Sequence, residues 1–414
     1  MIRHRISFAI LLCLALWQAA GPAPAAETGL FRRGTNLTWF AFPATTVIDG
    51  RTVYADPPYA GPDAHEPTDL TRFGFDHVRL LIDFGPLINA DGPHRRRLFE
   101  EIDQAIARLR RSGLGVIVTL LAPGLGGELP MAWLDGTDGP RFSRFKALVE
   151  EVAGRLEGLP AGRPVALELL NEPQQDCRAE KGTDWSVHQK VLVDDLRGRG
   201  IGLPLLLTGG CWSTIEGIVM LDGAEFADRR NLISVHFYDP FVFTHQGSDW
   251  ALPFLAEVKG LPYPAGRGAV AETLAETRAK FAASDRWRPA ERDAKQKEAE
   301  DAIRWYFTSA PGAAMIAERF ATLARWQQDN RIDPGQFVFT EFGAMRQPNA
   351  DADDEASRAR WLRDVSSAIE KNGWGWSLWV LHGLPFGLYP TDEASCPETD
   401  LIEALRLTPP VTCR

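Results

Sequence analysis

Short, continuously apolar segments recur along the chain and alternate with longer amphipathic ones. The stretch Val-Ile-Val-Thr-Leu-Leu within Gly115–Leu121 lacks the apolar–polar alternation of a half-exposed strand. Such runs indicate strands buried on both faces, as in a parallel sheet. The pattern predicts strands over Gly34–Trp39, His77–Ile82, Gly115–Leu121, Pro164–Leu170, Pro204–Thr208, Leu232–Phe237, Gln336–Thr340 and Gly375–Trp379.

The segments between these strands have the apolar spacing of helices. Within Arg96–Arg111, one face carries Leu98, Ile102, Ile106 and Leu109. Comparable patterns predict helices over Phe142–Leu156, Trp185–Gly198, Met315–Gln328 and Asp354–Asn372. Strands that alternate with helices over this length predict an α/β fold, a (β/α)8 TIM barrel that forms a single domain over residues 27–414.

Two stretches depart from the minimal barrel pattern. Thr45–Glu66 is rich in Pro, Gly and Asp and is interpreted as a long loop after the first strand. Ser248–Ala310 is a helical insertion between the sixth and seventh strands, and it begins at the face where barrel active sites lie. The insertion could form one wall of a cleft, or it could be a solvent-exposed segment remote from the substrate. We expect its ends, near Trp250 and Tyr263, to form the wall, with the charged middle outside.

The N-terminus and the charge limit the location and the partners of the protein. Basic residues precede an apolar run over residues 6–17 and an alanine-rich end, which predicts a secretory signal peptide over residues 1–26. We therefore expect a secreted or periplasmic monomer with no membrane attachment after cleavage. The net charge of −10 argues against nucleic acid and anionic membranes as partners, because both attract a basic surface.

Four cysteines remain after removal of the signal peptide. An even number in an oxidising compartment favours two disulfides over free buried thiols, although three pairings are possible. We expect Cys177–Cys211, because both residues follow neighbouring strands, and Cys396–Cys413, because these two are close in sequence. The chain has no Cys-x-x-C motif, so nothing supports a metal site or a redox function, and no cofactor is expected.

Two glutamates stand at the ends of predicted strands. Glu172 lies in Asn-Glu-Pro after the fourth strand, and Glu341 lies in Phe-Thr-Glu-Phe-Gly at the end of the seventh. The C-terminal ends of barrel strands meet at one mouth, so the two side chains can flank a bound sugar. Hydrolysis of a glycosidic bond requires two carboxyl groups in this way. Either glutamate alone could equally form a surface salt bridge.

With these motifs, the chain resembles glycoside hydrolase family 5, the cellulase family of clan A, over roughly residues 34–405. Bacterial endoglucanases of that family share several further segments: Val78-Arg79-Leu80, Val235-His236-Phe237-Tyr238, residues 239–247, Trp376-Ser377-Leu378-Trp379 and Phe386-Gly387-Leu388-Tyr389. The resemblance implies retaining hydrolysis of a β-linked glucan, with Glu341 as nucleophile and Glu172 as acid/base.

The resemblance also implies a set of residues that contact the substrate or orient the nucleophile: Arg79, Asn171, His236, Tyr238, His245 and Trp379. Several of them could instead have a purely structural role: Arg79 could form an ion pair inside the barrel, and His245 could stabilise a loop without contacting the substrate. Four tryptophans follow predicted strands and are candidates for stacking on sugar rings: Trp39, Trp133, Trp212 and Trp250.

One departure from the family concerns the substrate. Family members usually carry a histidine near the end of the third strand, whereas this chain reads Thr119-Leu120-Leu121-Ala122-Pro123 there. An exo-acting, β-1,3-directed or mannan-directed enzyme therefore stays open beside an endo-β-1,4-glucanase. A carbohydrate-binding protein without activity is a further alternative, although binding alone requires no pair of glutamates. The sequence has no Gly-x-Ser-x-Gly elbow, so a serine esterase is not supported. It also has no His-Glu-x-x-His motif, so a metallohydrolase is not supported either.

Overall fold

The computed structural model describes residues 30–49, 51–56, 67–122, 133–174, 177, 185–347, 350–383, 385–391, 394–409 and 413. The predicted signal peptide and the segment after the third predicted strand, residues 123–132, lie outside these ranges. No helix within the described ranges combines the length and apolarity needed to cross a bilayer.

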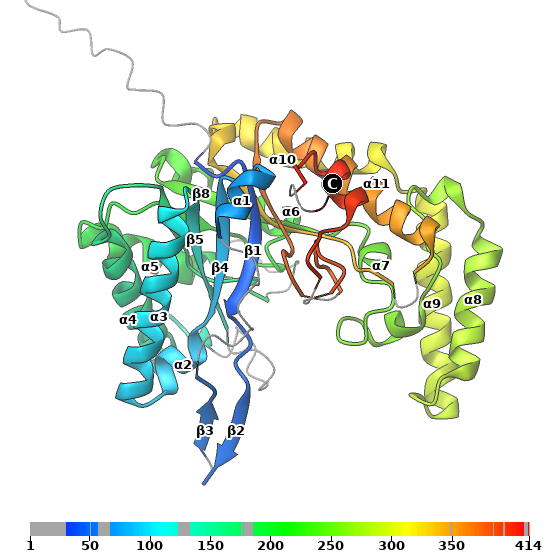
Figure 1. Cartoon of the computed structure of the whole chain (residues 1–414), viewed down its shortest axis with the longest axis horizontal. Coiled ribbons are helices and arrows are strands. Elements are labelled where there is room, and N and C mark those ends of the chain that lie inside the picture. The colour runs from blue at the N-terminus through cyan, green and yellow to red at the C-terminus, as the bar shows by residue number, and fades with distance from the viewer. Residues whose placement is uncertain are drawn as a thin grey trace, which may run out of the picture.

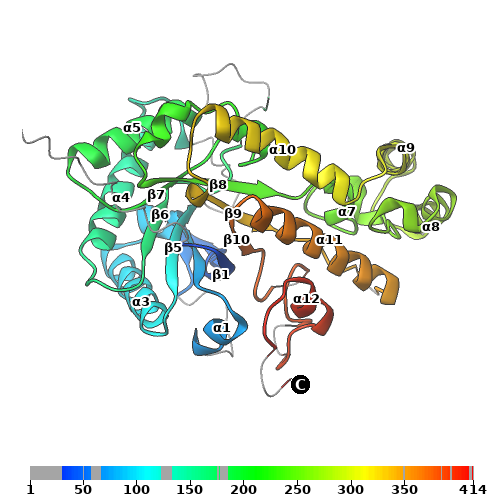
Figure 2. The ribbon, with the colours of Figure 1, turned by 90° about the horizontal axis from the view of Figure 1, so that it is seen from above.

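Eight parallel strands close into a barrel, which confirms the predicted TIM-barrel fold (Figure 2). Around the barrel, each strand pairs with its neighbours in the chain, and the last strand pairs with the first. The strands are β1 (Arg33–Phe40), β4 (His77–Asp83), β5 (Gly115–Leu121), β6 (Val165–Glu168), β7 (Leu205–Leu207), β8 (Asn231–Phe237), β9 (Phe337–Phe342) and β10 (Gly375–Leu378).

Helices surround the barrel and bury its outer face (Figure 2). The α-helices are α1 (Pro67–Phe73), α2 (Phe84–Asn89), α3 (Gly92–Arg111), α4 (Pro140–Glu157), α5 (Trp185–Gly198), α6 (Ile215–Ile218), α7 (Phe241–Thr244), α8 (Val270–Ala283), α9 (Pro289–Ser309), α10 (Ala313–Asp329), α11 (Ala352–Lys371) and α12 (Thr399–Ala404). The 3-10 helices are η2 (Gly223–Ala227), η3 (Pro253–Glu257), η4 (Ala265–Arg267) and η5 (Pro334–Gln336).

The start of α11 explains the acidic cluster at residues 351–355. The Asp351 carboxylate accepts hydrogen bonds from the backbone N–H groups of Asp353 and Asp354, and Asp354 bonds back to the N–H of Asp351. These bonds satisfy amide groups that have no partner inside the helix. The cluster is therefore a helix cap.

The interior of the barrel is layered, with an apolar floor beneath a polar layer. The floor consists of Phe31, Ile117, Ala166, Leu206, Leu232 and Val338. Side chains two positions apart share one face of a strand, so the residues two positions later also point inwards. On four strands these residues are polar, and hydrogen bonds join them into one layer: Thr119, Glu168, Ser234 and Thr340. The sealed floor leaves the C-terminal mouth as the side where polar chemistry can take place.

The segment after β1 is not the loop that we predicted. Thr45–Ile48 (β2) and Arg51–Tyr54 (β3) form an antiparallel hairpin that projects from the mouth of the barrel (Figure 1). Both strands are rich in β-branched residues, and Asp49 followed by Gly in the sequence is a typical two-residue turn. The Pro and Gly content that suggested a loop belongs mostly to residues 57–66, which lie outside the described residues.

The insertion between β8 and β9 contains α8 and α9, which pack against each other beside the barrel (Figures 1 and 2). An ion pair from Arg278 to Glu300 links the two helices on their exposed side. The expectation for Tyr263 is wrong: this residue is fully buried, and its hydroxyl donates to Asp364 on α11 at 2.9 Å. Its hydrogen bond links the insertion to α11, and a fully buried ring cannot line a cleft.

Both predicted disulfides are present. Cys177 is bonded to Cys211, between the segments that follow β6 and β7. Cys396 is bonded to Cys413 near the C-terminus. The first bond lies close to the C-terminal mouth of the barrel, because both of its segments follow strands that end there.

One buried cation joins the loops that follow β9 and β10. Arg358 on α11 donates from Nε to the carbonyl oxygen of Ala344 at 2.8 Å, and from Nη2 to those of Phe386 and Gly387 at 2.9 and 2.7 Å. Its Nη1 donates to Glu398 at 3.0 Å. The planar guanidinium can reach all of these acceptors at once, whereas a lysine ammonium cannot.

Replacement of this guanidinium should therefore destabilise the fold. We expect Arg358→Lys to lower the free energy of unfolding by about 2–3 kcal/mol, because several charge-assisted hydrogen bonds are lost. Urea denaturation followed by tryptophan fluorescence measures the change. Arg363→Lys, an exposed position on the same helix, is the matched control. Equal midpoints for the two variants would contradict the anchoring role.

Candidate active site

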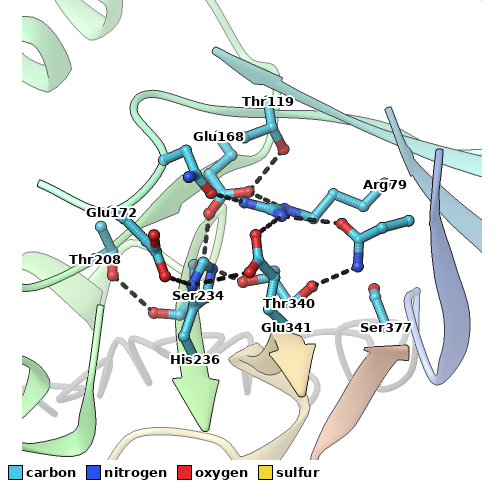
Figure 3. Close-up of polar contacts among 12 residues, drawn as sticks. Arg79, Thr119, Glu168, Glu172, Thr208, Ser234, His236, Thr340, Glu341 and Ser377 are labelled. Atoms are coloured by element: carbon cyan, nitrogen blue, oxygen red, sulfur yellow. Dashed lines mark hydrogen bonds and ion pairs between the residues drawn. The ribbon is translucent and has the colours of Figure 1, made fainter. Parts of the chain in front are cut away.

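Two glutamates approach each other at the mouth of the barrel. Glu341 lies within β9, and Glu172 lies beyond the end of β6. Each offers a carboxylate oxygen within 4.8 Å of the other. The structure thus brings together the two residues that the sequence singled out, and their carboxyl groups lie near each other on either side of the His236 ring (Figure 3).

Irregular backbone aims both side chains. The register between β8 and β9 shifts, so that Val235 pairs with Phe339 but His236 pairs with Glu341. This bulge adds one residue to β9, and Thr340 and Glu341 both point inwards as a result. Glu172 has a φ of 43°, a left-handed conformation that costs a non-glycine residue about 1–3 kcal/mol. The positions of both carboxyl groups therefore depend on locally irregular backbone.

Arg79 on β4 lies at the centre of the site and is fully buried. Its guanidinium donates from Nη1 to Glu341 Oε1 at 2.6 Å, from Nε to Glu168 Oε2 at 2.6 Å, and from Nη2 to Asn171 Oδ1 at 2.7 Å (Figure 3). One planar group thus fixes residues from β6, β9 and the segment after β6. The expected contact between Arg79 and the proposed nucleophile is present in the structure.

Two members of this network were absent from the sequence prediction. Asn36 on β1 accepts from Arg79 Nη1 at 2.9 Å and donates to the carbonyl oxygens of Thr340 and Leu378. Glu168 on β6 is fully buried against the same guanidinium. A signal for Glu168 was available, because a charged residue inside the apolar run Val-Ala-Leu-Glu-Leu-Leu requires a buried partner.

Tyr238 and His236 complete the polar surroundings of the two glutamates. The Tyr238 hydroxyl donates to Glu341 Oε2 at 2.8 Å. His236 Nδ1 lies 2.9 Å from Glu172 Oε1 and 3.5 Å from Glu341 Oε2, so the imidazole stands between the two carboxyl groups. Arg79 and Tyr238 hold opposite oxygens of Glu341, which fixes the orientation of that carboxylate.

Burial shifts the pKa values of these groups in different ways. Desolvation raises the pKa of Glu172 to about 7; the charge of Arg79 opposes this rise and that of Glu168 reinforces it. Burial also raises the pKa of Glu341 above its ordinary value, while His236 and Arg79 act in the opposite direction. Burial lowers the pKa of His236 to about 4, so the imidazole is neutral at pH 7. A carboxyl group with a pKa of about 7 is about half protonated at neutral pH, so Glu172 can carry a proton there.

An apolar cluster lines the site next to Glu341. Phe386, Val380 and Met345 pack together, and Tyr238 and Trp379 pack against them. Trp379 follows β10 and is partly exposed, so its indole can present a flat face at the mouth.

The aromatic surface continues into the insertion. The ring of Trp250, which is 61% exposed, lies 5.5 Å from that of His245 and 6.5 Å from that of Phe386. His245 itself is buried between Phe241 and Tyr238, and its Nδ1 lies 3.0 Å from the Thr244 hydroxyl. His245 therefore supports the surface from below, and Trp250 forms its exposed part.

The other candidate tryptophans occupy different surroundings. Trp39 is buried, and its ring lies against Arg108 of α3, which places it on the helical side of β1 and away from the glutamates. Trp133 is buried against Phe84. Trp212 is 46% exposed, and its backbone N–H donates to the carbonyl oxygen of Pro173, directly after Glu172. Of these three, Trp212 is the one that the structure leaves available to a ligand near the site.

The same geometry defines the place where a cation would bind. Among the described residues, one group offers three mutually close ligand atoms, and it consists of Glu172, His236 and Glu341. The positive charge of Arg79, 2.6 Å from Glu341, opposes the entry of a metal ion there.

Comparison with known proteins decides the family. The family model described as Cellulase (glycosyl hydrolase family 5) matches residues 60–384. The chain belongs to this family. The matched residues include both Glu172 and Glu341.

Individual relatives are distant. The family 5 chain is 29% identical to cellodextrinase A of Ruminococcus flavefaciens over 44% of its length and 52% of the relative, and 26% identical to endoglucanase C of Acetivibrio thermocellus over 47% of its length and 55% of the relative. The chain thus spans about half the length of the curated relatives it matches.

Solved structures share the fold over most of the chain. Endoglucanase Cel5A of Thermotoga maritima has a TM-score of 0.62 at 22% identity, and the match covers 91% of this chain and 98% of that one. A family 5 xyloglucanase of Bacteroides ovatus has a TM-score of 0.63 at 17% identity, and the match covers 92% and 75%. These similarities establish the barrel fold.

The protonation state of Glu172 can be tested directly. We expect its carboxyl group to titrate with a pKa of about 7, protonated at pH 6 and ionised at pH 8, because burial disfavours the charged form. A ¹³C NMR titration of protein labelled at the glutamate carboxyl carbon measures this, and the spectrum of Glu172→Gln assigns the resonance. Titration complete below pH 5 would contradict this electrostatic account.

Proposed function

We propose that the protein hydrolyses a β-linked glucan with retention of configuration, with Glu172 as acid/base and Glu341 as nucleophile. The observation that carries this proposal is the approach of the two carboxyl groups, which offer oxygens within 4.8 Å of each other. Retaining enzymes hold the two groups about 5–5.5 Å apart, whereas inverting enzymes leave about 6.5–9.5 Å for a water molecule. The short separation supports direct attack by a carboxylate.

In the first step, the Glu341 carboxylate attacks the anomeric carbon while Glu172 gives its proton to the departing glycosidic oxygen. A glycosyl ester on Glu341 forms and the aglycone leaves as an alcohol. Arg79 and Tyr238 hold the two oxygens of Glu341, so the attacking group needs little reorganisation. Asn171, whose side-chain oxygen accepts from Arg79, binds the 2-hydroxyl of the sugar at the cleavage point in this proposal.

In the second step, the Glu172 carboxylate removes a proton from water, and the oxygen of that water attacks the anomeric carbon. The ester bond breaks, and Glu341 returns as a carboxylate that Arg79 and Tyr238 stabilise. The covalent intermediate has removed the negative charge of Glu341, so the pKa of Glu172 falls at the stage where Glu172 must act as a base.

The relatives and the aromatic surface favour a β-1,4-linked glucan as substrate. The curated relatives include a cellodextrinase and endoglucanases, and structures of Thermotoga maritima Cel5A contain cellobiose or mannotriose. Trp379 offers a flat face next to Glu341, and Trp212 and Trp250 offer exposed faces on two loops nearby. Such faces stack on the apolar sides of sugar rings.

The proposed location follows from the sequence and from the two disulfides. We place the mature protein in the periplasm or outside the cell, because disulfides persist in oxidising compartments. Its partner there is a β-linked polysaccharide or oligosaccharide.

A product profile of the purified protein tests the substrate. We would incubate it with defined β-1,4, β-1,3, mixed-linkage and mannan oligosaccharides and identify the products by chromatography and mass spectrometry. Internal cleavage of β-1,4-linked glucose chains supports an endoglucanase. Release from chain ends, or preference for β-1,3 or mannan substrates, would replace that substrate assignment by the corresponding one. No products from any substrate would favour a binding protein without activity.

The two glutamates should respond differently to substitution. Glu341→Ala should abolish hydrolysis of every substrate, because no nucleophile remains. Glu172→Ala should slow cellobiosides with poor leaving groups by about 10²–10⁴-fold and affect a dinitrophenyl leaving group in the first step far less, since only the former require an acid. Steady-state kinetics on a series of aryl glycosides measures this. Equal losses across the series would contradict the assignment of roles.

Trp250 should contribute to binding beyond the cleavage point. We expect Trp250→Ala to raise KM for cello-oligosaccharides by about 2- to 10-fold, equivalent to about 0.5–1.5 kcal/mol of stacking energy. Hydrolysis of a short aryl glycoside that does not reach this surface should change little. Trp305→Ala is the matched control, because Trp305 is 55% exposed on α9, outside the aromatic surface. Equal effects of the two variants would show that Trp250 lies outside the binding surface.

A further inference from the structure

Glu168 is a fully buried carboxylate close to the two glutamates of the proposed mechanism. It has no exposed surface and accepts three hydrogen bonds: from Arg79 Nε at 2.6 Å, from the Thr119 hydroxyl at 2.7 Å and from the Ser234 hydroxyl at 2.6 Å. These donors come from β4, β5 and β8. The carboxylate thus lies deeper in the barrel than Glu172 and Glu341, in the polar layer (upper part of Figure 3).

Neutralisation of the Arg79 charge does not by itself explain why Glu168 is buried here as a second carboxylate. Glu341 already pairs with the guanidinium at 2.6 Å, so one positive and one negative charge would balance. Glu168 adds a second negative charge at a position where burial of an ion costs several kcal/mol unless it is well compensated. This second negative charge becomes necessary when Glu341 loses its own charge, because Arg79 then has no other anionic partner among the described residues.

Such a change occurs in the proposed mechanism, on which this inference rests. When Glu341 becomes a glycosyl ester, its negative charge disappears and Arg79 loses that partner. The guanidinium would then be an unpaired buried cation beside a sugar that itself gains positive charge in the transition state. Glu168, 2.6 Å from Arg79 Nε, keeps the guanidinium paired at this stage.

We propose that Glu168 is a positioning residue that fixes the guanidinium of Arg79 and offsets its charge, so that Glu341 stays reactive as a nucleophile. It acts through Arg79 and touches neither the substrate nor the reacting atoms. The bond to Nε occupies one edge of the guanidinium and directs Nη1 and Nη2 towards Glu341 and Asn171.

Because Glu168 offsets the charge of Arg79, its removal should have opposite effects on the two chemical steps. Without the charge of Glu168, Arg79 would stabilise the free Glu341 carboxylate more strongly, and attack on the sugar would become slower. Breakdown of the glycosyl ester regenerates that carboxylate, so the stronger positive field would favour it. A residue that only supports the fold would slow both steps when it is disturbed.

The charge of Glu168 also acts on Glu172. It raises the pKa of Glu172, in addition to the larger effect of burial. Removal of the charge should therefore let Glu172 lose its proton at lower pH. The basic limb of the pH profile of kcat/KM then moves towards acid.

The test compares Glu168→Gln with the wild-type enzyme on two rates. The first is kcat/KM for an aryl β-cellobioside as a function of pH, which reports attack by Glu341. The second is the reactivation rate of the enzyme after trapping with a 2-deoxy-2-fluoro cellobioside, which reports breakdown of the ester. We expect kcat/KM at pH 7 to fall by about tenfold or more, the basic limb to move to lower pH, and reactivation to be as fast as in the wild type or faster.

Glu370→Gln is the matched control, because it makes the same change in a carboxylate that pairs with arginine elsewhere. Glu370 on α11 accepts from Arg33 and Arg406 and from the indole of Trp376. This variant should lower the melting temperature and leave both rates and the pH profile unchanged. Glu168→Asp keeps the charge but shortens the side chain; it should reduce kcat/KM without moving the basic limb.

The outcomes separate the two proposals. If mass spectrometry finds no fluorosugar on Glu341 of the wild-type enzyme, the proposed mechanism fails. If the sugar is on Glu341 but Glu168→Gln slows both rates equally and leaves the pH profile in place, Glu168 is structural and this inference is overturned. If Glu168→Gln does not fold, Glu168→Asp decides the matter, and a moved basic limb in that variant would overturn the inference.

Discussion

The buried guanidinium of Arg79 is the charge around which the interior of the barrel is arranged. A cation without solvent is stable only if anions and hydrogen-bond acceptors surround it, and this requirement is met by side chains from several strands. Glu168 and Glu341 supply the negative charge, and Asn36 and Asn171 supply neutral acceptors. The position of Glu341 is thus tied to the same planar centre as those of Glu168 and Asn171, and Glu341 cannot move away without leaving a buried charge less well paired.

The layers of the barrel give this centre its low-dielectric surroundings. The apolar floor excludes water from below, and the polar layer above it joins β5, β6, β8 and β9 through hydrogen bonds. At the mouth, the bulge in β9 and the left-handed conformation of Glu172 direct the last two carboxyl groups towards each other. Burial then gives Glu172 a pKa of about 7, while direct donors hold the charge of Glu341. The fold therefore produces two chemically different glutamates from identical side chains.

The sequence was sufficient for the features that repeat or that follow from strand ends. Buried strands appear in the sequence as apolar runs, so the fold could be predicted. A carboxyl group directly after such a run lies at the mouth of a barrel, so the position of Glu172 and Glu341 at that mouth could be predicted as well. Features that depend on contacts between distant segments could not. The inward turn of Glu341 depends on a bulge, and the burial of Tyr263 depends on Asp364 from another helix. The direction of Trp39 likewise depends on Arg108 of α3.

The central claim is that Glu341 attacks the sugar directly, because Arg79 and Tyr238 hold it close to Glu172. The stereochemistry of the first product tests this most directly. Proton NMR spectra, recorded during the first minutes of hydrolysis of a β-cello-oligosaccharide at high enzyme concentration, distinguish the two anomers before mutarotation mixes them. The account predicts that the β-anomer appears first, since two displacements restore the configuration. Initial appearance of the α-anomer would mean a single displacement by water and would contradict the role of Glu341 as nucleophile.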